Sequence, residues 1–249
     1  MTLLPQLLSF VLTLALLVFL GRWITRQVQQ LGMHLTANEG AAVMAYFVVM
    51  LPGIALHELS HYVMALALGL KVGQFSLGPR RQGNMVELGS VTIASGGAFL
   101  DSLVGLAPFL SGTAVLLFVG YRVFDVGALG AAWQAGGWGA VLAAVNGIWR
   151  VSDFWLWAYL IFVVSNSMIP SQADRRPWLT VAIFGIIALA LTYLLGGVSL
   201  LSASVGVEAT GVLQTLTLSF LFTLAFDLIA AAGLWIVEVA LLALQRPQN

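Results

Sequence analysis

The sequence His-Glu-Leu-Ser-His at residues 57–61 lies inside an apolar segment, residues 41–70, that contains no other charged residue. On an α-helix, positions i and i+4 share one face, so His57 and His61 offer two imidazoles to one metal ion, with Glu58 beside them as a general base. Ionisable groups are costly in hydrocarbon, and those inside a membrane span usually serve a function. The segment therefore predicts a membrane-spanning helix with a zinc site for hydrolysis. A metal-free polar cluster between helices is the alternative interpretation.

The composition indicates an integral membrane protein. Of the 249 residues, 60% are hydrophobic and 8% are charged, whereas soluble domains carry about 25% charged residues. This length accommodates about six membrane spans and no sizeable soluble domain. The formal net charge is zero, which gives no electrostatic case for nucleic acid as a partner.

The apolar runs predict an all-α polytopic membrane protein with a short β-hairpin. Residues 1–249 are expected to form a single transmembrane domain, with its core at residues 41–176 and its C-terminal spans at residues 178–244. Residues 128–149 are rich in Gly and Ala and less hydrophobic than a membrane span requires, which favours an interfacial or re-entrant segment. About six transmembrane helices are expected, at residues 3–20, 41–70, 98–120, 151–169, 178–195 and 212–244.

Between the second and third predicted spans, the pattern changes to that of strands. Residues 74–77 alternate polar with apolar, residues 78–84 hold turn-forming Gly, Pro and Asn, and residues 85–93 form a second extended run. This pattern predicts a β-hairpin. Because open backbone edges cannot face lipid, the hairpin must lie at the interface or line a protein cavity. It either pairs with an extended substrate by strand addition or is a connector that covers the site.

A catalytic zinc ion normally has three protein ligands and one open position. The chain has no cysteine and three histidines, so the third ligand must be a carboxylate or His34. Asp174 is the best-placed carboxylate, because Pro170 should break the fourth span and let the chain fold back toward the metal. The alternative interpretation is that Asp174 is a surface carboxylate paired with Arg175 or Arg176.

Three other carboxylates lie in or near predicted spans. Asp101 is expected to cap the start of the third span rather than to bind metal. Asp227 and Glu238 are about three helical turns apart in the last span. They are expected to form hydrogen bonds between helices or to lie at the interface, with a second polar site as the alternative.

Taken together, these residues resemble the site-2 protease family of intramembrane zinc metalloproteases. The resemblance covers about residues 41–176 and rests mainly on residues 57–61 and on Asn166, Pro170 and Asp174. Further matching positions are Gly69, Phe75, Gly78 and residues 107–112. Positions that depart from the family, where glycine is usual, are Ser60 and Arg175.

The resemblance implies that His57, His61 and Asp174 bind Zn2+ and that Glu58 activates a water molecule. Asn166 would donate a hydrogen bond to the tetrahedral oxyanion; alternatively, its amide bonds the backbone of a broken helix. The implied function is a zinc-dependent intramembrane endopeptidase that hydrolyses peptide bonds of a membrane-anchored protein substrate. The other interpretations are a metal-ion transporter or channel, and an inactive relative that binds membrane clients without cutting them.

The distribution of basic residues predicts an orientation in the lipid bilayer. Six of the ten basic residues follow the second, fourth and sixth spans, which makes those ends cytoplasmic; they are Lys71, Arg80, Arg81, Arg175, Arg176 and Arg246. His61 lies about 13 Å inside the end of the second span at about 1.5 Å per residue. The site is therefore expected nearer the cytoplasmic face of a cell membrane, either plasma or inner. The sequence does not indicate the oligomeric state.

Overall fold

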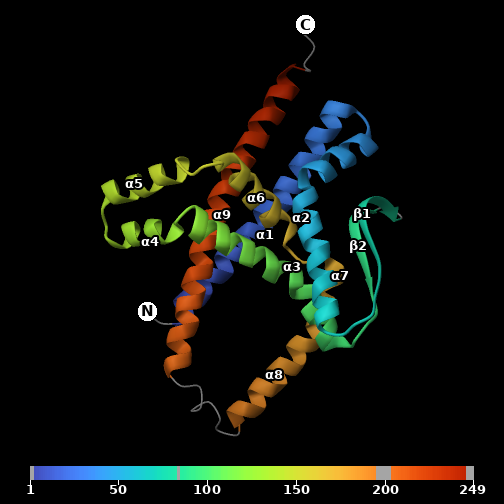
Figure 1. Cartoon of the computed structure of the whole chain (residues 1–249), viewed down its shortest axis with the longest axis vertical. Coiled ribbons are helices and arrows are strands. Elements are labelled where there is room, and N and C mark those ends of the chain that lie inside the picture. Colours follow the sequence, from blue (N-terminus) through green and yellow to red (C-terminus); the bar gives the residue numbers. More distant parts are fainter. Residues whose placement is uncertain (1–2, 83–84, 195–202, 245–249) are drawn as a thin grey trace.

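The structure, a computed structural model, describes residues 3–82, 85–194 and 203–244. This part of the chain is mostly helical and contains one two-stranded antiparallel sheet (Figure 1), as the sequence predicts. The elements are α1 (Leu3–Thr36), α2 (Glu39–Ala67), β1 (Val72–Gln82), β2 (Met85–Ile93), α3 (Ala98–Phe118), the π-helical turn η1 (Val119–Val123), α4 (Val126–Gln134), α5 (Trp138–Trp149), α6 (Phe154–Ser167), α7 (Gln172–Arg175), α8 (Trp178–Leu194) and α9 (Ala203–Leu244).

Four helices of the described chain are long and apolar enough to cross a membrane: α1, α2, α3 with η1, and the Glu208–Leu244 part of α9. A fifth is added if α5 and α6, which bend by 94° relative to each other, count as one broken span. Helix α8 has 17 residues and extends about 26 Å, slightly less than the hydrocarbon core of about 30 Å. The structure thus does not confirm six spans. Residue 195 of the fifth predicted span lies outside the described residues.

The predicted interfacial or re-entrant segment forms two short helices, α4 and α5, that project from the bundle as a helical hairpin (Figure 1). Gly136 has a φ of +70°, a conformation that favours glycine, and it separates the two helices. At the tip, the rings of Trp133 and Trp138 pack edge to face with centroids 6.1 Å apart. Both rings are exposed, as is typical of tryptophans at a membrane–water interface.

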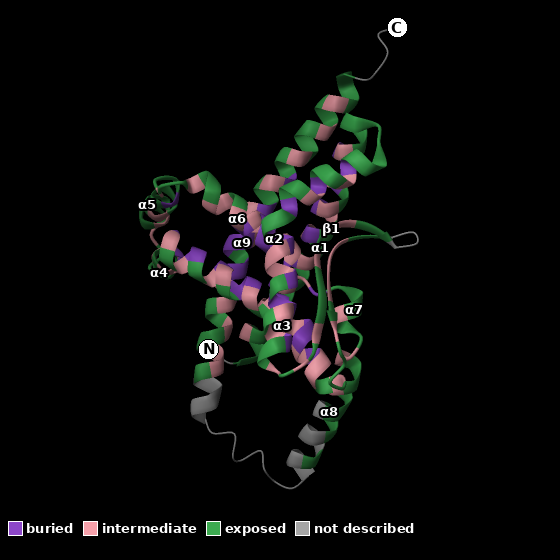
Figure 2. Ribbon diagram, turned by 45° about the vertical axis from the view of Figure 1, so that its right-hand side comes forward, coloured by how far each residue is buried: buried purple, intermediate pink, exposed green. Residues whose placement is uncertain are grey.

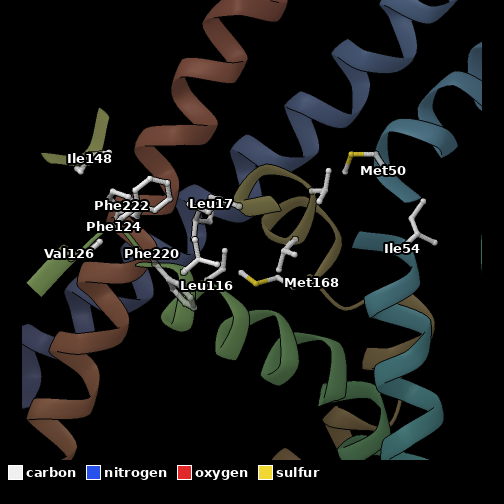
Figure 3. Packing of buried hydrophobic residues seen from close by; sticks show 14 of the residues in the cluster. Leu17, Met50, Ile54, Leu116, Phe124, Val126, Ile148, Met168, Phe220 and Phe222 are labelled. Carbon is white, nitrogen blue, oxygen red and sulfur yellow. The ribbon is translucent and has the colours of Figure 1, made fainter. Parts of the chain in front are cut away.

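The buried core lies where α1, α2, α3, α6 and α9 meet, and Figure 3 shows its packing. Phe220 of α9 is fully buried and packs against Phe10 of α1 and Phe109 of α3. Figure 2 shows that much of the outer surface of the long helices is exposed, and this surface includes large apolar side chains such as Phe19 and Leu228. An apolar exterior of this kind is consistent with a membrane protein.

Helix α2 packs closely on α6 just after a proline. Pro52 lies inside α2 and removes one helical hydrogen bond, and the hydroxyl of Tyr159 on α6 donates to the nearby Val49 carbonyl at 2.7 Å. At Gly53 the two backbones touch, because a Cβ there would lie 2.2 Å from the Val163 carbonyl oxygen. Small residues allow such close approach between membrane helices.

The predicted β-hairpin is confirmed, and it lies alongside α2 (Figure 1). Strand β1 is longer than expected, since residues 78–82, predicted in the turn, belong to the strand. Irregularities of register, one of them between Leu77 and Arg80, accommodate Gly78 and Pro79 within β1, as β-bulges do. Residues 83–84 of the predicted turn lie outside the described residues.

The contact between α2 and α6 predicts a destabilising substitution. Gly53→Ala is expected to lower the free energy of unfolding by about 1–3 kcal/mol, because the added methyl group forces the two backbones apart. Gly233→Ala, on α9 with no atom within 4 Å of the added Cβ, is the control and should be neutral or slightly stabilising. Thermal unfolding of the detergent-solubilised variants measures the difference, and equal stability of the two variants would contradict this packing.

Candidate metal centre

The structure brings His57, His61 and Asp174 together. The two histidines lie one turn apart on α2, with their rings edge to face and their centroids 4.8 Å apart. Their Nε2 atoms are 3.2 Å apart. Oδ1 of Asp174, on α7, is 3.2 Å from Nε2 of His61, and Oδ2 is 3.7 Å from Nε2 of His57. One ligand atom from each residue therefore faces a common space.

Two backbone carbonyls set the orientation of the imidazole rings. Nδ1 of His57 lies 2.7 Å from the Ser167 carbonyl oxygen at the end of α6, and Nδ1 of His61 lies 2.9 Å from the Val104 carbonyl oxygen of α3. A carbonyl oxygen only accepts, so each Nδ1 must donate its proton. In a neutral imidazole, Nε2 is then an acceptor. Two such nitrogens and a carboxylate thus converge, an arrangement that requires a cation or additional protons between them.

The donor set fits a zinc ion. Ligand atoms bonded at about 2.0–2.1 Å in a tetrahedron lie about 3.3–3.4 Å apart. The two Nε2 atoms here are 3.2 Å apart, Oδ1 of Asp174 is 3.2 Å from Nε2 of His61, and the other carboxylate oxygen, Oδ2, is 3.7 Å from Nε2 of His57. Metal-binding histidines usually donate their other ring N–H to a carbonyl or carboxylate, as both do here. Nitrogen and oxygen ligands are also the ones that this cysteine-free chain offers. The role of these residues as metal ligands stays a prediction.

Asp174 is held by the start of α7. Its Oδ2 accepts from the Ser171 backbone N–H at 2.7 Å, and Oγ of Ser171 accepts from the Asp174 N–H at 3.3 Å, which forms a capping box. Burial of the Asp174 carboxyl opposes its charge, but its contacts with His57, His61 and Ser171 outweigh burial and hold its pKa well below the usual range. Within the described part of the chain, Asp174 forms no ion pair with the arginines that follow it.

Close backbone approaches at glycines position the partners of this cluster. A Cβ at Gly105 of α3 would lie 2.2 Å from the carbonyl oxygen of Asp174, and one at Gly53 of α2 would lie 2.4 Å from Oγ of Ser167. Gly105 therefore lets Asp174, which supplies the carboxylate, approach α3. Gly53 lets Ser167, whose carbonyl accepts from His57, approach α2. Neither role could be predicted from the sequence, because a glycine in a membrane helix gives no sign of what it packs against.

Glu58 lies beside the cluster, buried on α2 between the two histidines. It is close enough to His57, His61 and Asp174 for direct charge–charge interaction. Strand β2 packs against its side chain, since a Cβ at Gly89 would lie 2.6 Å from Cγ of Glu58. The role of Glu58 as a general base stays a prediction.

A cavity of about 660 Å³ opens next to His61 and Asp174. Residues of β2, α3 and α7 line it, together with Ser95 before α3 and with Arg176 and Pro177 after α7. Asp101 also lines this cavity, but its carboxylate accepts from the Gly96 N–H at 2.9 Å and from the Ser95 hydroxyl at 2.6 Å. Asp101 thus ties down the loop before α3 from the first turn of the helix. It is not the cap that the sequence predicts, because Gly97 is the N-cap of α3 and no side chain caps that end.

None of the hydrogen bonds of Asn166 is made with a residue of the cluster. Its Nδ2 donates to the Phe162 carbonyl at 2.8 Å, to Oγ of Ser165 at 3.2 Å and to Oδ1 of Asp227 at 3.3 Å. Its Oδ1 is directed toward Gly21 of α1, where an added Cβ would lie 3.2 Å away. The structure therefore shows the alternative arrangement, an amide that bonds a helix backbone. The predicted oxyanion role gains no support from these contacts.

The two carboxylates of the last predicted span form hydrogen bonds between helices, as expected. Asp227 of α9, 1% exposed, accepts from Ser165 of α6 at 3.1 Å. Glu238 accepts from Gln27 of α1 at 2.7 Å. Both carboxylates therefore hold α9 to its neighbours and lie apart from the metal centre.

Comparisons of the chain with protein-family models, curated proteins and solved structures find no match in any of the three. A functional assignment therefore rests on the chemistry of the site.

Replacement of Asp174 tests its part in the centre. Asp174→Ala is expected to weaken zinc binding by about a hundredfold or more, because even an outer-shell partner of a metal ligand contributes 10–100-fold. Asp101→Ala removes a carboxylate from the same cavity and should leave zinc binding nearly unchanged. Competition of each purified variant with a chromophoric chelator measures the affinities, and equal affinities would exclude Asp174 as a ligand.

Acidification is expected to release the zinc. Each proton bound at Nε2 of His57 or His61 removes a lone pair that the metal needs, whereas Asp174 stays ionised because its pKa is held low. Zinc retained after gel filtration should therefore fall as the pH decreases. Retention that stays constant down to pH 4 would show that the imidazoles do not bind the metal.

Proposed function

We propose that this protein is a zinc-dependent intramembrane endopeptidase of the site-2 protease type that its sequence resembles. The observation that carries the proposal is the convergence of two imidazole nitrogens and one carboxylate beside Glu58 on an apolar helix. Three protein ligands and an adjacent carboxylate base are what a hydrolytic zinc centre needs.

In the proposed reaction, His57, His61 and Asp174 hold the metal and Glu58 transfers protons. A bound zinc ion supplies Lewis acidity to the scissile carbonyl and to water. Glu58 takes a proton from the attacking water and delivers it to the leaving amine. The Ser167 and Val104 carbonyls keep both imidazoles in the Nδ1–H form, so that their Nε2 atoms stay available.

The arrangement of ligands favours an enzyme over a metal-ion transporter. A transport path distributes ionisable groups through several spans. In the described residues, His57, His61 and Asp174 are the one group of three that could hold a metal. Asp227 and Glu238, the next candidates, are engaged in hydrogen bonds between helices.

The proposed substrate is a membrane-anchored protein, because the centre lies on a helix long and apolar enough to span a bilayer. We further propose that α8 and the bent α5–α6 pair complete six crossings, with the centre nearer the cytoplasmic face. A substrate segment would enter the cavity beside His61 in an extended conformation, since the peptide bonds of an intact helix are shielded.

The proposal is tested by a variant that keeps the metal ligands but lacks the residue that transfers protons. Glu58→Gln is expected to retain zinc but to lower kcat for a model transmembrane substrate by about 10²–10⁴-fold, because the amide no longer accepts a proton. Glu39→Gln, on the same helix, is the control and should cleave as the wild type does, since its exposed ion pair with Arg81 contributes little. Zinc transport into vesicles by a wild type that cleaves nothing would support the transporter, and zinc binding with neither activity would support an inactive client binder.

A further inference from the structure

The carboxylate of Glu58 is oriented by packing. None of the described residues forms a hydrogen bond with it, although a general base must be held within reach of the proton that it takes. A glutamate side chain has several rotatable bonds, and fixing them requires contacts. Those contacts come from strand β2.

Strand β2 meets the Glu58 side chain at Gly89. A Cβ at position 89 would lie 2.6 Å from Cγ, 3.0 Å from Cδ and 2.9 Å from Oε1 of Glu58. All three atoms belong to one side chain, so no residue other than glycine fits here without moving the carboxylate. Glycine weakens a strand, and its presence at this point of closest approach therefore calls for a specific reason.

The hairpin is fixed against α2 around this point. Leu77 of β1 lies opposite Gly89, and two residues earlier Phe75 packs edge to face on Tyr62 of α2, with ring centroids 6.0 Å apart. The exposed ion pair between Arg81 of β1 and Glu39 of α2 contributes little to this packing. The packing of the hairpin on α2 thus holds the backbone of β2 at Gly89 against Glu58.

We infer that Gly89 is a positioning residue for the general base: its missing side chain lets β2 press on Glu58 and direct the carboxylate toward the metal centre. This inference rests on the proposed function and adds to it a role for the hairpin. The strand holds the base in place and does more than cover the site.

The first test measures the contact between Glu58 and residue 89 and does not depend on catalytic activity. A C–C bond is about 1.5 Å long, so Cβ of Glu58 and a Cβ at position 89 are at most about 4.1 Å apart, within the disulfide range of about 3.5–4.5 Å. The chain has no cysteine, so Glu58→Cys/Gly89→Cys should form one internal disulfide on mild oxidation in membranes. The control is Glu58→Cys/Ser90→Cys. Because successive side chains of a strand point to opposite faces, residue 90 faces away from Glu58, and this pair should not cross-link. Equal cross-linking of both pairs, or of neither, would overturn the inference.

The second test separates positioning from strand stability and from substrate binding. Gly89→Ala is expected to lower kcat at least tenfold, with KM and zinc content near those of the wild type, because the methyl group displaces the carboxylate alone. Ser90→Ala, on the other face, should not change kcat. If Gly89 had only a structural role in the strand, Gly89→Ala would not lower kcat, since alanine suits a strand better than glycine does.

The outcomes distinguish this inference from the proposed function. An active wild type with an unchanged kcat for Gly89→Ala, or with a change in KM alone, overturns the role of Gly89 and leaves the protease in place. A wild type that binds zinc and cleaves no substrate overturns the protease and the positioning role with it. If Gly89→Ala does not fold, the disulfide test decides.

Discussion

Three hydrogen-bond acceptors meet inside an apolar helical bundle, and this convergence is the constraint on which the site depends. Nε2 of His57 and Nε2 of His61 are 3.2 Å apart, and the carboxylate of Asp174 lies against both. Because each Nδ1 proton is donated to a backbone carbonyl, the imidazoles have no proton left for one another in their neutral form. A cation bound by these residues would relieve this repulsion, and it would offset the cost of placing three polar groups inside an apolar bundle.

The rest of the fold positions these atoms through close backbone contacts. Lipid provides no hydrophobic driving force between helices, so membrane helices pack through small residues. Gly53 brings the end of α6 to His57, Gly105 brings α7 to α3, and Gly89 brings β2 to Glu58. The break after α6 then lets Asp174 approach α2, where a capping box with Ser171 fixes its carboxylate. Helix α2 supplies both histidines and Glu58, the other components come from α3, α6, α7 and β2, and glycines set the spacing between these elements.

The sequence predicts the parts of the site that are local. The five residues at 57–61 define one helical face, and the alternating pattern near residues 74–93 indicates the hairpin. The proximity of Asp174 follows from a proline break and a resemblance, but its distances depend on how α3 packs on α7. The hydrogen-bond acceptors at Val104 and Ser167 could not be predicted, because any residue offers a carbonyl. Asn166 shows the limit of analogy, since its amide bonds Phe162 and Asp227. The number of spans is also ambiguous, because α8 is close to the minimum length for a crossing.

Zinc K-edge X-ray absorption of the purified protein tests the central claim most directly. The account predicts one zinc ion per chain, bound by nitrogen and oxygen atoms at about 2.0–2.1 Å, with multiple-scattering features from two imidazoles. Substitution of either motif histidine should reduce the imidazole count by one. A protein that binds no stoichiometric zinc when it is supplied, or zinc whose spectrum shows no imidazole, would contradict the account.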